Sequence, residues 1–68
     1  MRTFSTDLSR FTSNGYGTLH DPAAAELHEG ERIGVTDEEA DTLEAEVIRV
    51  TGESAEVRIF WDEVLRRA

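Results

Sequence analysis

The sequence has 68 residues, no cysteine, and fifteen acidic against seven basic side chains, which gives a formal net charge of −8. Disulfide bonds and thiolate metal sites are therefore excluded, and the negative charge disfavours binding to nucleic acids and to anionic membranes. No apolar run approaches the roughly 20 residues of a membrane-spanning helix, and the first residues lack the apolar stretch of a signal peptide, so we expect a cytoplasmic protein.

The negative charge is concentrated in the middle of the chain. Residues 21–46 carry a net charge of −9, whereas residues 1–20 carry +1 and residues 47–68 are neutral. A chain of this length forms one domain at most, so we treat residues 1–68 as a single small domain with one strongly acidic segment.

Residues 1–20 allow three structures. Asn14-Gly15 is a tight-turn signal, because both residues tolerate a positive φ, and it predicts an extra strand or a hairpin. Three apolar side chains are instead spaced like one face of a short helical turn, namely Phe4, Leu8 and Phe11. The high content of serine, threonine and glycine is also compatible with a flexible segment. The sequence leaves these alternatives open.

A two-turn helix is predicted over residues 22–29. Asp21 is a suitable N-cap, and Pro22 fits the first helical position, where its missing N–H costs nothing. Gly30 suits the left-handed residue that ends a helix. Such a short helix is not stable alone in water, so Leu27 must pack against another element.

From residue 31 onward the apolar residues alternate with a period of two, which predicts strands at residues 32–36, 43–50 and 55–61. The last two strands form a hairpin whose register follows from keeping their apolar residues on one face. The expected pairs are Val47 with Val57, Ala45 with Ile59, Leu43 with Trp61 and, on the other face, Glu46 with Arg58. This register requires a three-residue loop at residues 51–53.

The adjacent Phe60 and Trp61 must point to opposite faces of their strand. The alternation places Trp61 in the core and Phe60 on the second face, with Ile48 and Val50. We expect the helix or the N-terminal segment to cover part of that second face. Asp62 is expected to cap a short C-terminal helical turn.

Three segments, GERIGVTD (residues 30–37), LEAEVIRV (43–50) and AEVRIFWD (55–62), follow the order of glycine and acid, apolar strand, acidic loop, long strand, tight turn and strand. In this order, residues 30–62 resemble small SH3-like β-barrels of the KOW and Tudor kind. The resemblance implies a mainly β fold, a small antiparallel sheet or SH3-like partial barrel with short helices. A full barrel of this kind has five strands, so a strand from residues 11–20 would have to complete it. KOW modules that bind RNA are usually basic, whereas this stretch is acidic.

No residue pattern indicates catalysis or a cofactor. The two histidines, His20 and His28, lack the framing motif of a catalytic group. The acidic run at residues 37–41 lacks the alternating oxygen donors and the central glycine of an EF-hand loop. We therefore expect no enzyme, no cofactor and no metal site.

The leading hypothesis is a non-catalytic interaction or regulatory module that binds a protein partner with a basic surface. The residues expected to contact the partner are Asp37, Glu38, Glu39, Asp41, Glu44, Glu46, Arg58 and Phe60. The alternatives are an SH3-like module associated with transcription or translation machinery, an acidic mimic of DNA, and a homodimer that hides the second sheet face. Direct nucleic-acid binding and membrane association are not expected.

Overall fold

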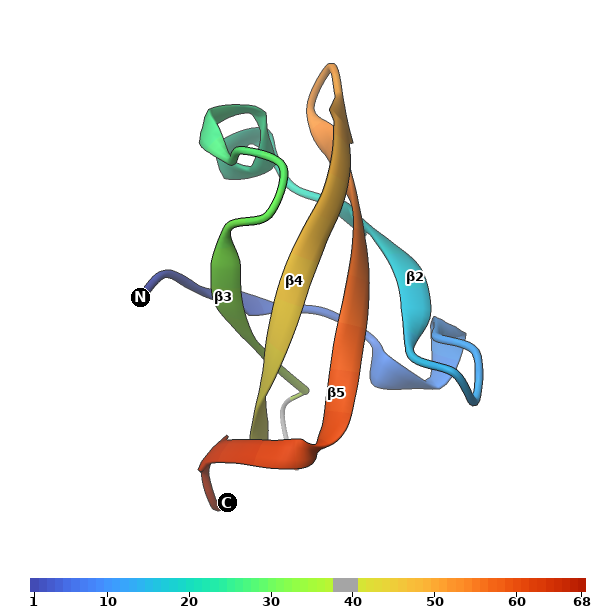
Figure 1. Cartoon of the computed structure of the whole chain (residues 1–68), viewed down its shortest axis with the longest axis vertical. Helices are drawn as coiled ribbons and strands as arrows, with labels where there is room; N and C mark the ends of the chain where they lie inside the picture. Colours follow the sequence, from blue (N-terminus) through green and yellow to red (C-terminus); the bar gives the residue numbers. More distant parts are fainter. Residues whose placement is uncertain (38–40) are drawn as a thin grey trace.

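A computed structural model describes residues 1–37 and 41–68 of the chain, and the described part consists mainly of β-strands (Figure 1). In chain order the elements are β1 (Thr3–Ser5), the 3-10 turn η1 (Leu8–Arg10), β2 (Tyr16–His20), the 3-10 turn η2 (Pro22–Glu26), β3 (Arg32–Thr36), β4 (Thr42–Thr51) and β5 (Ser54–Arg66). The predicted mainly β fold is confirmed. Across the described residues there is no helix of the length and apolarity that crossing a bilayer requires.

The five strands form one sheet in the order β1-β3-β4-β5-β2. β3, β4 and β5 follow one another as antiparallel neighbours, and β2 lies antiparallel to β5. β1 pairs with β3 in the parallel direction, so the sheet is mixed rather than purely antiparallel. Figure 1 shows β1 passing behind β3 and β4, and the first two strands of the chain thus form the two opposite edges of the sheet.

The core lies on the inner face of the curved sheet. Its buried side chains are all apolar: Phe4, Phe11, Leu19, Ala24, Leu27, Ile33, Val35, Leu43, Ala45, Val47, Ala55, Val57 and Ile59. The alternation predicted for β3, for β4 up to Val47 and for the first half of β5 therefore holds. Each of the large aliphatic side chains among them contributes about 1.5–3 kcal/mol by leaving water.

The helix predicted at residues 22–29 is wrong in type and length. Asp21 does cap the segment, since its carboxylate accepts a hydrogen bond of 2.8 Å from the Ala23 N–H, but only the 3-10 turn η2 (Pro22–Glu26) follows. Leu27 is already extended and fully packed into the core. Ala24 and Leu27 are both buried and lie three positions apart, the spacing at which a 3-10 turn aligns side chains, so one such turn is enough to place both in the core.

The predicted β4–β5 register is correct in the middle of the hairpin, where Val47 pairs with Val57, Ala45 with Ile59 and Glu46 with Arg58. Towards the turn it is wrong by one residue, because Ile48 forms a bulge. Arg49 then lies opposite Glu56, Thr51 pairs with Ser54, and the predicted three-residue loop becomes the two-residue turn Gly52-Glu53. The bulge also turns Val50 towards the core side, where it packs against the buried cluster.

The second half of β5 bends away from the predicted register. Leu43 pairs with Val64 instead of Trp61, so the four residues 60–63 of β5 fall opposite the single residue Glu44 of β4. β5 bends sharply in its second half (Figure 1). Trp61 is 39% exposed at this bend, and the prediction that it belongs to the core is wrong. The predicted C-terminal helical turn after Asp62 is wrong as well, since β5 continues to Arg66.

Residues 1–20 contain two of the structures that the sequence left open. Of the three apolar residues spaced like a helical turn, only Leu8 lies in one, the 3-10 turn η1 with Asp7 as its N-cap, whereas Phe4 lies in β1 and Phe11 follows the turn as its C-cap. The Asn14-Gly15 signal corresponds to a tight turn in which the Gly15 N–H donates to the Thr12 carbonyl at 2.8 Å. The strand after this turn, β2, pairs with β5 rather than with the residues before the turn.

Candidate functional site

A row of four polar and aromatic side chains crosses the outer face of the sheet. Arg32 on β3 lies opposite Glu46 on β4, Glu46 lies opposite Arg58 on β5, and Arg58 lies opposite Tyr16 on β2. Directly opposite residues on neighbouring strands have Cβ atoms about 4.5–5.5 Å apart, so these side chains are neighbours across four strands. We call this row, together with Glu44 and Phe60, the outer-face cluster.

Arginine stacked on aromatic rings is the main feature of the outer-face cluster. The guanidinium carbon of Arg32 lies 4.7 Å from the centre of the Phe60 ring. The guanidinium carbon of Arg58 lies 5.5 Å from the same ring and 5.6 Å from the centre of the Tyr16 ring. All three distances are within the about 6 Å range of a cation–π interaction. Phe60 is therefore held between two arginines on the outer face, and the predicted cover by a helix is wrong, because η2 packs on the inner side with Ala24 in the core.

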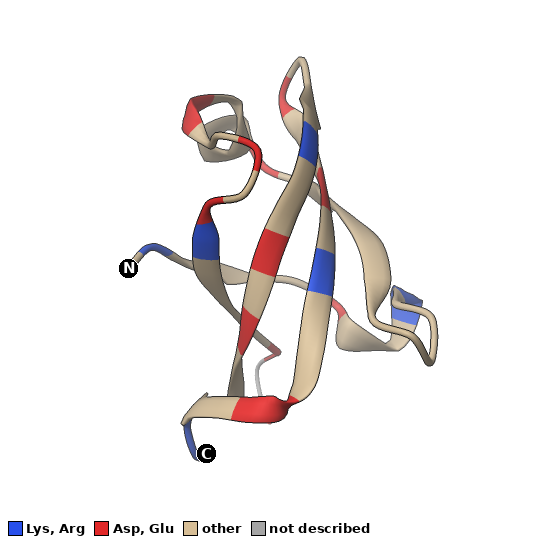
Figure 2. Cartoon of the chain, in the orientation of Figure 1, with Lys and Arg blue, Asp and Glu red and all other residues tan. Residues whose placement is uncertain are grey.

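The charges of the outer face are paired across strands. Arg32 Nη1 lies 2.6 Å from Glu44 Oε2, and beyond the cluster Arg49 Nη2 lies 2.6 Å from Glu56 Oε1. Figure 2 shows a blue segment on β3 and both blue and red segments on β4 and β5. Exposed ion pairs of this kind contribute only about 0–1 kcal/mol to stability. Charged side chains of a binding partner can therefore replace one member of such a pair with little loss of free energy.

Exposed apolar surface borders the outer-face cluster. Tyr16 is 49% exposed and Ile48, at the bulge of β4, is 40% exposed. On the side of β5, a hollow of about 400 Å³ continues past Trp61 to Ser13 and Asn14. The face thus combines aromatic rings, arginine and an adjacent depression, the residue types and shape that are enriched at binding hot spots.

The structure brings together half of the residues predicted to contact a partner. Glu44, Glu46, Arg58 and Phe60 all belong to the outer-face cluster. Asp37 lies elsewhere, where its carboxylate accepts a hydrogen bond of 3.2 Å from the Leu8 N–H. Asp41 accepts a hydrogen bond of 2.8 Å from the Ala68 N–H and lies 3.5 Å from the Arg67 guanidinium. Glu38 and Glu39 lie outside the described residues.

Two members of the outer-face cluster are absent from the predicted contact residues. Arg32 alternates with the inward Ile33, so strand periodicity already places it on the outer face. Tyr16 reaches the cluster only because β2 pairs with β5, and no local pattern predicts that pairing.

The described acidic residues of the segment 21–46 lie at several separate places on the molecule. Glu26, Glu29 and Glu31 lie in and after η2, whereas Asp37 and Asp41 lie near the far ends of β3 and β4 (Figure 2). Glu44 lies on the outer face next to Arg32. The net charge of the protein is therefore negative, but positive and negative side chains are present in similar numbers on its outer face.

Within residues 1–37 and 41–68, no three histidine, aspartate or glutamate side chains are placed to hold a metal ion. The His20 imidazole Nδ1 lies 3.1 Å from the hydroxyl of Ser54, on the exposed edge of the hairpin.

Comparisons with family models, with curated proteins and with solved structures found no match for this chain. Its class is thus defined by its fold alone, a mainly β protein with a five-stranded mixed sheet. The resemblance to SH3-like modules stays a prediction.

Proposed function

We propose that this protein is a non-catalytic interaction module that binds a protein partner with a basic surface through its outer-face cluster. The observation that carries the proposal is the stacking of Arg32 and Arg58 on the exposed side of Phe60, with Tyr16 beside them. Aromatic residues and arginine are enriched among the residues that dominate binding energies, whereas a purely structural sheet face needs no such cluster.

Charge supports the choice of a basic partner. The net charge of −8 attracts a basic surface over the distance of a Debye length and accelerates encounter. At contact, Glu44 and Glu46 are available to basic side chains of the partner, because their present arginine neighbours are exposed or half-exposed. Long-range attraction then favours encounter, and the aromatic rings of the outer-face cluster contribute the short-range apolar contact.

Binding measurements at two salt concentrations test the proposal. The tagged full chain is used to purify partners, and the affinity of each purified partner is then measured at about 0.1 M and about 1 M salt, where the Debye length falls from about 10 Å to about 3 Å. We expect the affinity to fall at high salt. We also expect the variant Phe60→Ala to weaken binding by about tenfold or more, as at other aromatic anchors.

Two arginine variants provide a matched comparison. Arg58→Ala removes a stacked member of the outer-face cluster, whereas Arg67→Ala removes an equally charged residue near the C-terminus. The proposal requires a clear loss of affinity for Arg58→Ala and a small loss for Arg67→Ala. Equal affinities of the two variants, or an affinity that does not depend on salt, would contradict it. A salt-independent dimer detected by sedimentation would assign the outer face to self-association instead.

A further inference from the structure

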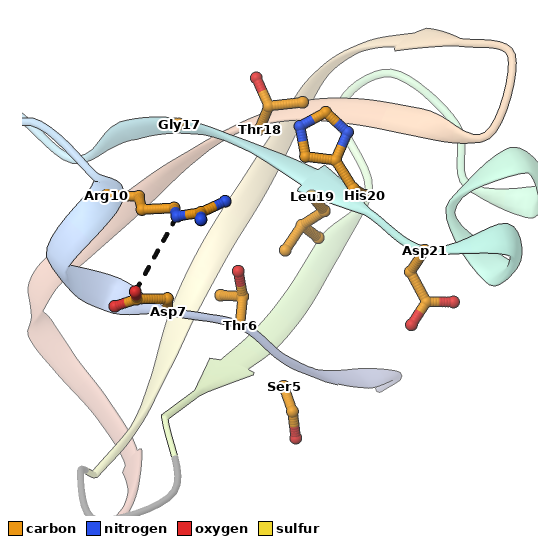
Figure 3. A pocket seen from close by; sticks show the side chains of 9 residues that line it. All are labelled: Ser5, Thr6, Asp7, Arg10, Gly17, Thr18, Leu19, His20 and Asp21. Atoms are coloured by element: carbon orange, nitrogen blue, oxygen red, sulfur yellow. Dashed lines mark ion pairs between the residues drawn. The ribbon is translucent and has the colours of Figure 1, made fainter.

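The two edge strands of the sheet, β1 and β2, line the same hollow. This hollow has a volume of about 400 Å³ and is bordered by Ser5 and Thr6 on one side and by residues 17–21 on the other. Figure 3 shows β1 and β2 running along its two sides, with Leu19 pointing inward between them. We call this hollow the edge slot.

The main-chain groups of β2 that face the edge slot follow from the pairing of β2 with β5. Gly15 and Ile59 form a hydrogen-bonded pair, since the Ile59 N–H donates to the Gly15 carbonyl at 2.8 Å. Hydrogen-bonded pairs recur at every second residue of an antiparallel ladder, so Gly17 and Leu19 also direct their N–H and C=O groups towards β5. The N–H and C=O groups of the alternate residues, Thr18 and His20, therefore point away from β5.

These outward groups of Thr18 and His20 are unpaired in the described part of the chain. The main-chain groups of Tyr16 also point away from β5, but they are paired. The Tyr16 carbonyl accepts from the Thr12 N–H, and the Tyr16 N–H donates to the Thr12 hydroxyl. Among the described residues, β5 is the only strand that pairs with β2. A row of unpaired donors and acceptors on an exposed strand edge is a template for one more strand.

The opposite wall limits what can enter the edge slot. On either side of β1, the Arg2 carbonyl accepts from the Gly34 N–H at 2.8 Å, and the Thr6 N–H donates to the Thr36 carbonyl at 2.9 Å. Because these groups face β3, the main-chain groups of the intervening Ser5 point towards the slot. A hollow of about 400 Å³ between two strand edges has room for a few residues of one extended chain, but not for the edge of a second sheet.

The charges around the edge slot indicate what kind of extended chain it accepts. Asp21 lies at one end, and Asp7 with Arg10 lies at the other, where the Arg10 Nε is 3.9 Å from a carboxylate oxygen of Asp7 (Figure 3). The only arginine of the slot thus already has a carboxylate neighbour. Together with the net charge of −8, this arrangement favours a basic chain.

We propose that the edge slot binds an extended basic peptide segment of a partner protein, which adds a strand to β2 by pairing with the main-chain groups of Thr18 and His20. Strand addition takes its affinity from main-chain hydrogen bonds and its selectivity from side chains on alternate positions. The site is distinct from the outer-face cluster, because it uses the edge of the sheet rather than its face.

Amide hydrogen exchange on the full chain tests this proposal residue by residue. The probe is a heptapeptide of alternating lysine and valine, and the readout is the exchange rate of each backbone amide with and without saturating peptide. We expect the amides of Thr18 and His20 to exchange fast in the free protein and to slow by at least about tenfold when the peptide is bound. The amides of Gly17 and Leu19, which face β5, should not change. Slow exchange of Thr18 and His20 in the free protein, or no change on addition of peptide, would overturn the proposal.

Two control peptides separate main-chain pairing from charge attraction. The same heptapeptide with N-methyl groups at alternate residues keeps its charge but cannot form the ladder, and it should bind at least about tenfold more weakly. A heptapeptide of alternating glutamate and valine should also bind more weakly, because of the net charge of −8. Equal binding of the N-methylated peptide would overturn strand addition, and equal binding of the acidic peptide would overturn the assignment of a basic segment.

Variants of the protein give an independent test. Thr18→Pro removes the outward N–H without removing a hydrogen bond to β5, a position where an edge strand tolerates proline, and it should weaken binding about fivefold. Thr18→Val keeps the N–H and should bind like the wild type. Phe60→Ala, in the outer-face cluster, should also bind the peptide normally, so failure of this proposal and failure of the proposed function are distinguishable. If Thr18→Pro does not fold, strand addition is tested instead by comparing the affinities of the unmodified and the N-methylated peptide for the wild-type chain.

Discussion

The indole N–H of Trp61 donates a hydrogen bond of 2.9 Å to the main-chain carbonyl of Ser13, which lies 48 positions earlier in the chain. This bond joins the bend of β5 to the tight turn before β2. Trp61 is 39% exposed, so its contribution here combines one polar contact with partial burial of the ring. The only tryptophan of the chain thus positions a turn beside the outer-face cluster.

Replacing Trp61 by phenylalanine should remove this hydrogen bond while keeping an aromatic ring. We expect a loss of about 0.5–1.5 kcal/mol in the free energy of unfolding, measured by urea denaturation followed by circular dichroism. Tyr16→Phe is the matched control, because it removes an exposed hydroxyl that has no protein partner within the described residues, and it should change stability by less than about 0.5 kcal/mol. Equal effects of the two substitutions would show that the contact of Trp61 with Ser13 contributes nothing.

Gly15 is expected to be the glycine least tolerant of substitution. Its φ is +91°, and a Cβ at this position would lie 2.2 Å from the main-chain oxygen of Ile59. Gly15→Ala should therefore cost about 3 kcal/mol or more, which approaches the whole stability of a domain of this size. The control is Gly52→Ala, where φ is +59° but no atom lies within 4 Å, so only the left-handed backbone costs about 1–2 kcal/mol. A Gly15→Ala variant as stable as Gly52→Ala would contradict the close approach of the 12–15 turn to β5.

Removing the cap of η2 should destabilise the protein moderately. Asp21→Ala loses the hydrogen bond that the carboxylate accepts from the Ala23 N–H, and we expect a loss of about 1 kcal/mol in the free energy of unfolding. Asp21→Asn keeps an acceptor oxygen at the same place and should retain most of the stability. If Asp21→Asn and Asp21→Ala are equally destabilised in urea, the charge of Asp21, and not its capping bond, is the stabilising feature.

The pKa of Asp7 should be lower than that of an ordinary aspartate. The main causes are hydrogen bonds from the hydroxyl and then the N–H of Ser9, at 2.6 and 3.0 Å, followed by the smaller attraction of Arg10. Because the pKa is lowered in the folded state, the stability that Asp7 contributes is present above the pKa of the unfolded chain. It is lost as the pH falls through the lowered pKa of the folded state.

A carboxyl-carbon NMR titration measures this shift directly. Ser9→Ala should move the pKa of Asp7 up towards its ordinary value, because the largest cause is gone. Arg10→Ala should move it less, since the guanidinium is 3.9 Å away and exposed. A larger upward shift for Arg10→Ala than for Ser9→Ala would show that charge, rather than hydrogen bonding, dominates at η1.

The residues that were placed correctly from sequence are those governed by local alternation. Ile33 and Val35 of β3, and the pairing of Val47 with Val57, follow from a period of two with one buried face, because a slip of one residue would expose every apolar side chain. The same rule placed Glu46 opposite Arg58. Asp21 was also recognised as a cap, because capping depends only on the next few residues.

The wrong predictions concern the positions where the pairing of β4 with β5 shifts its register. The bulge at Ile48 and the bend at residues 60–63 let a long hairpin curve around a small core, and neither leaves a signature in the alternation of residue types. Trp61 was misplaced because the alternation rule fails at such a bend. Asp37 and Asp41 are close to Glu44 in the sequence, but the fold places both of them away from the outer-face cluster.

The amino-acid sequence alone determined that this chain builds a β-sheet with one apolar face, because alternation over a few residues decides which side chains avoid water. Only the tertiary structure decided which distant segments meet: that β2 joins β5 and brings Tyr16 to Arg58, and that β1 and β2 become facing edges. The physical reason is that such long-range pairings depend on the curvature of the sheet around a shared core, an energy to which all strands contribute and which no single segment encodes.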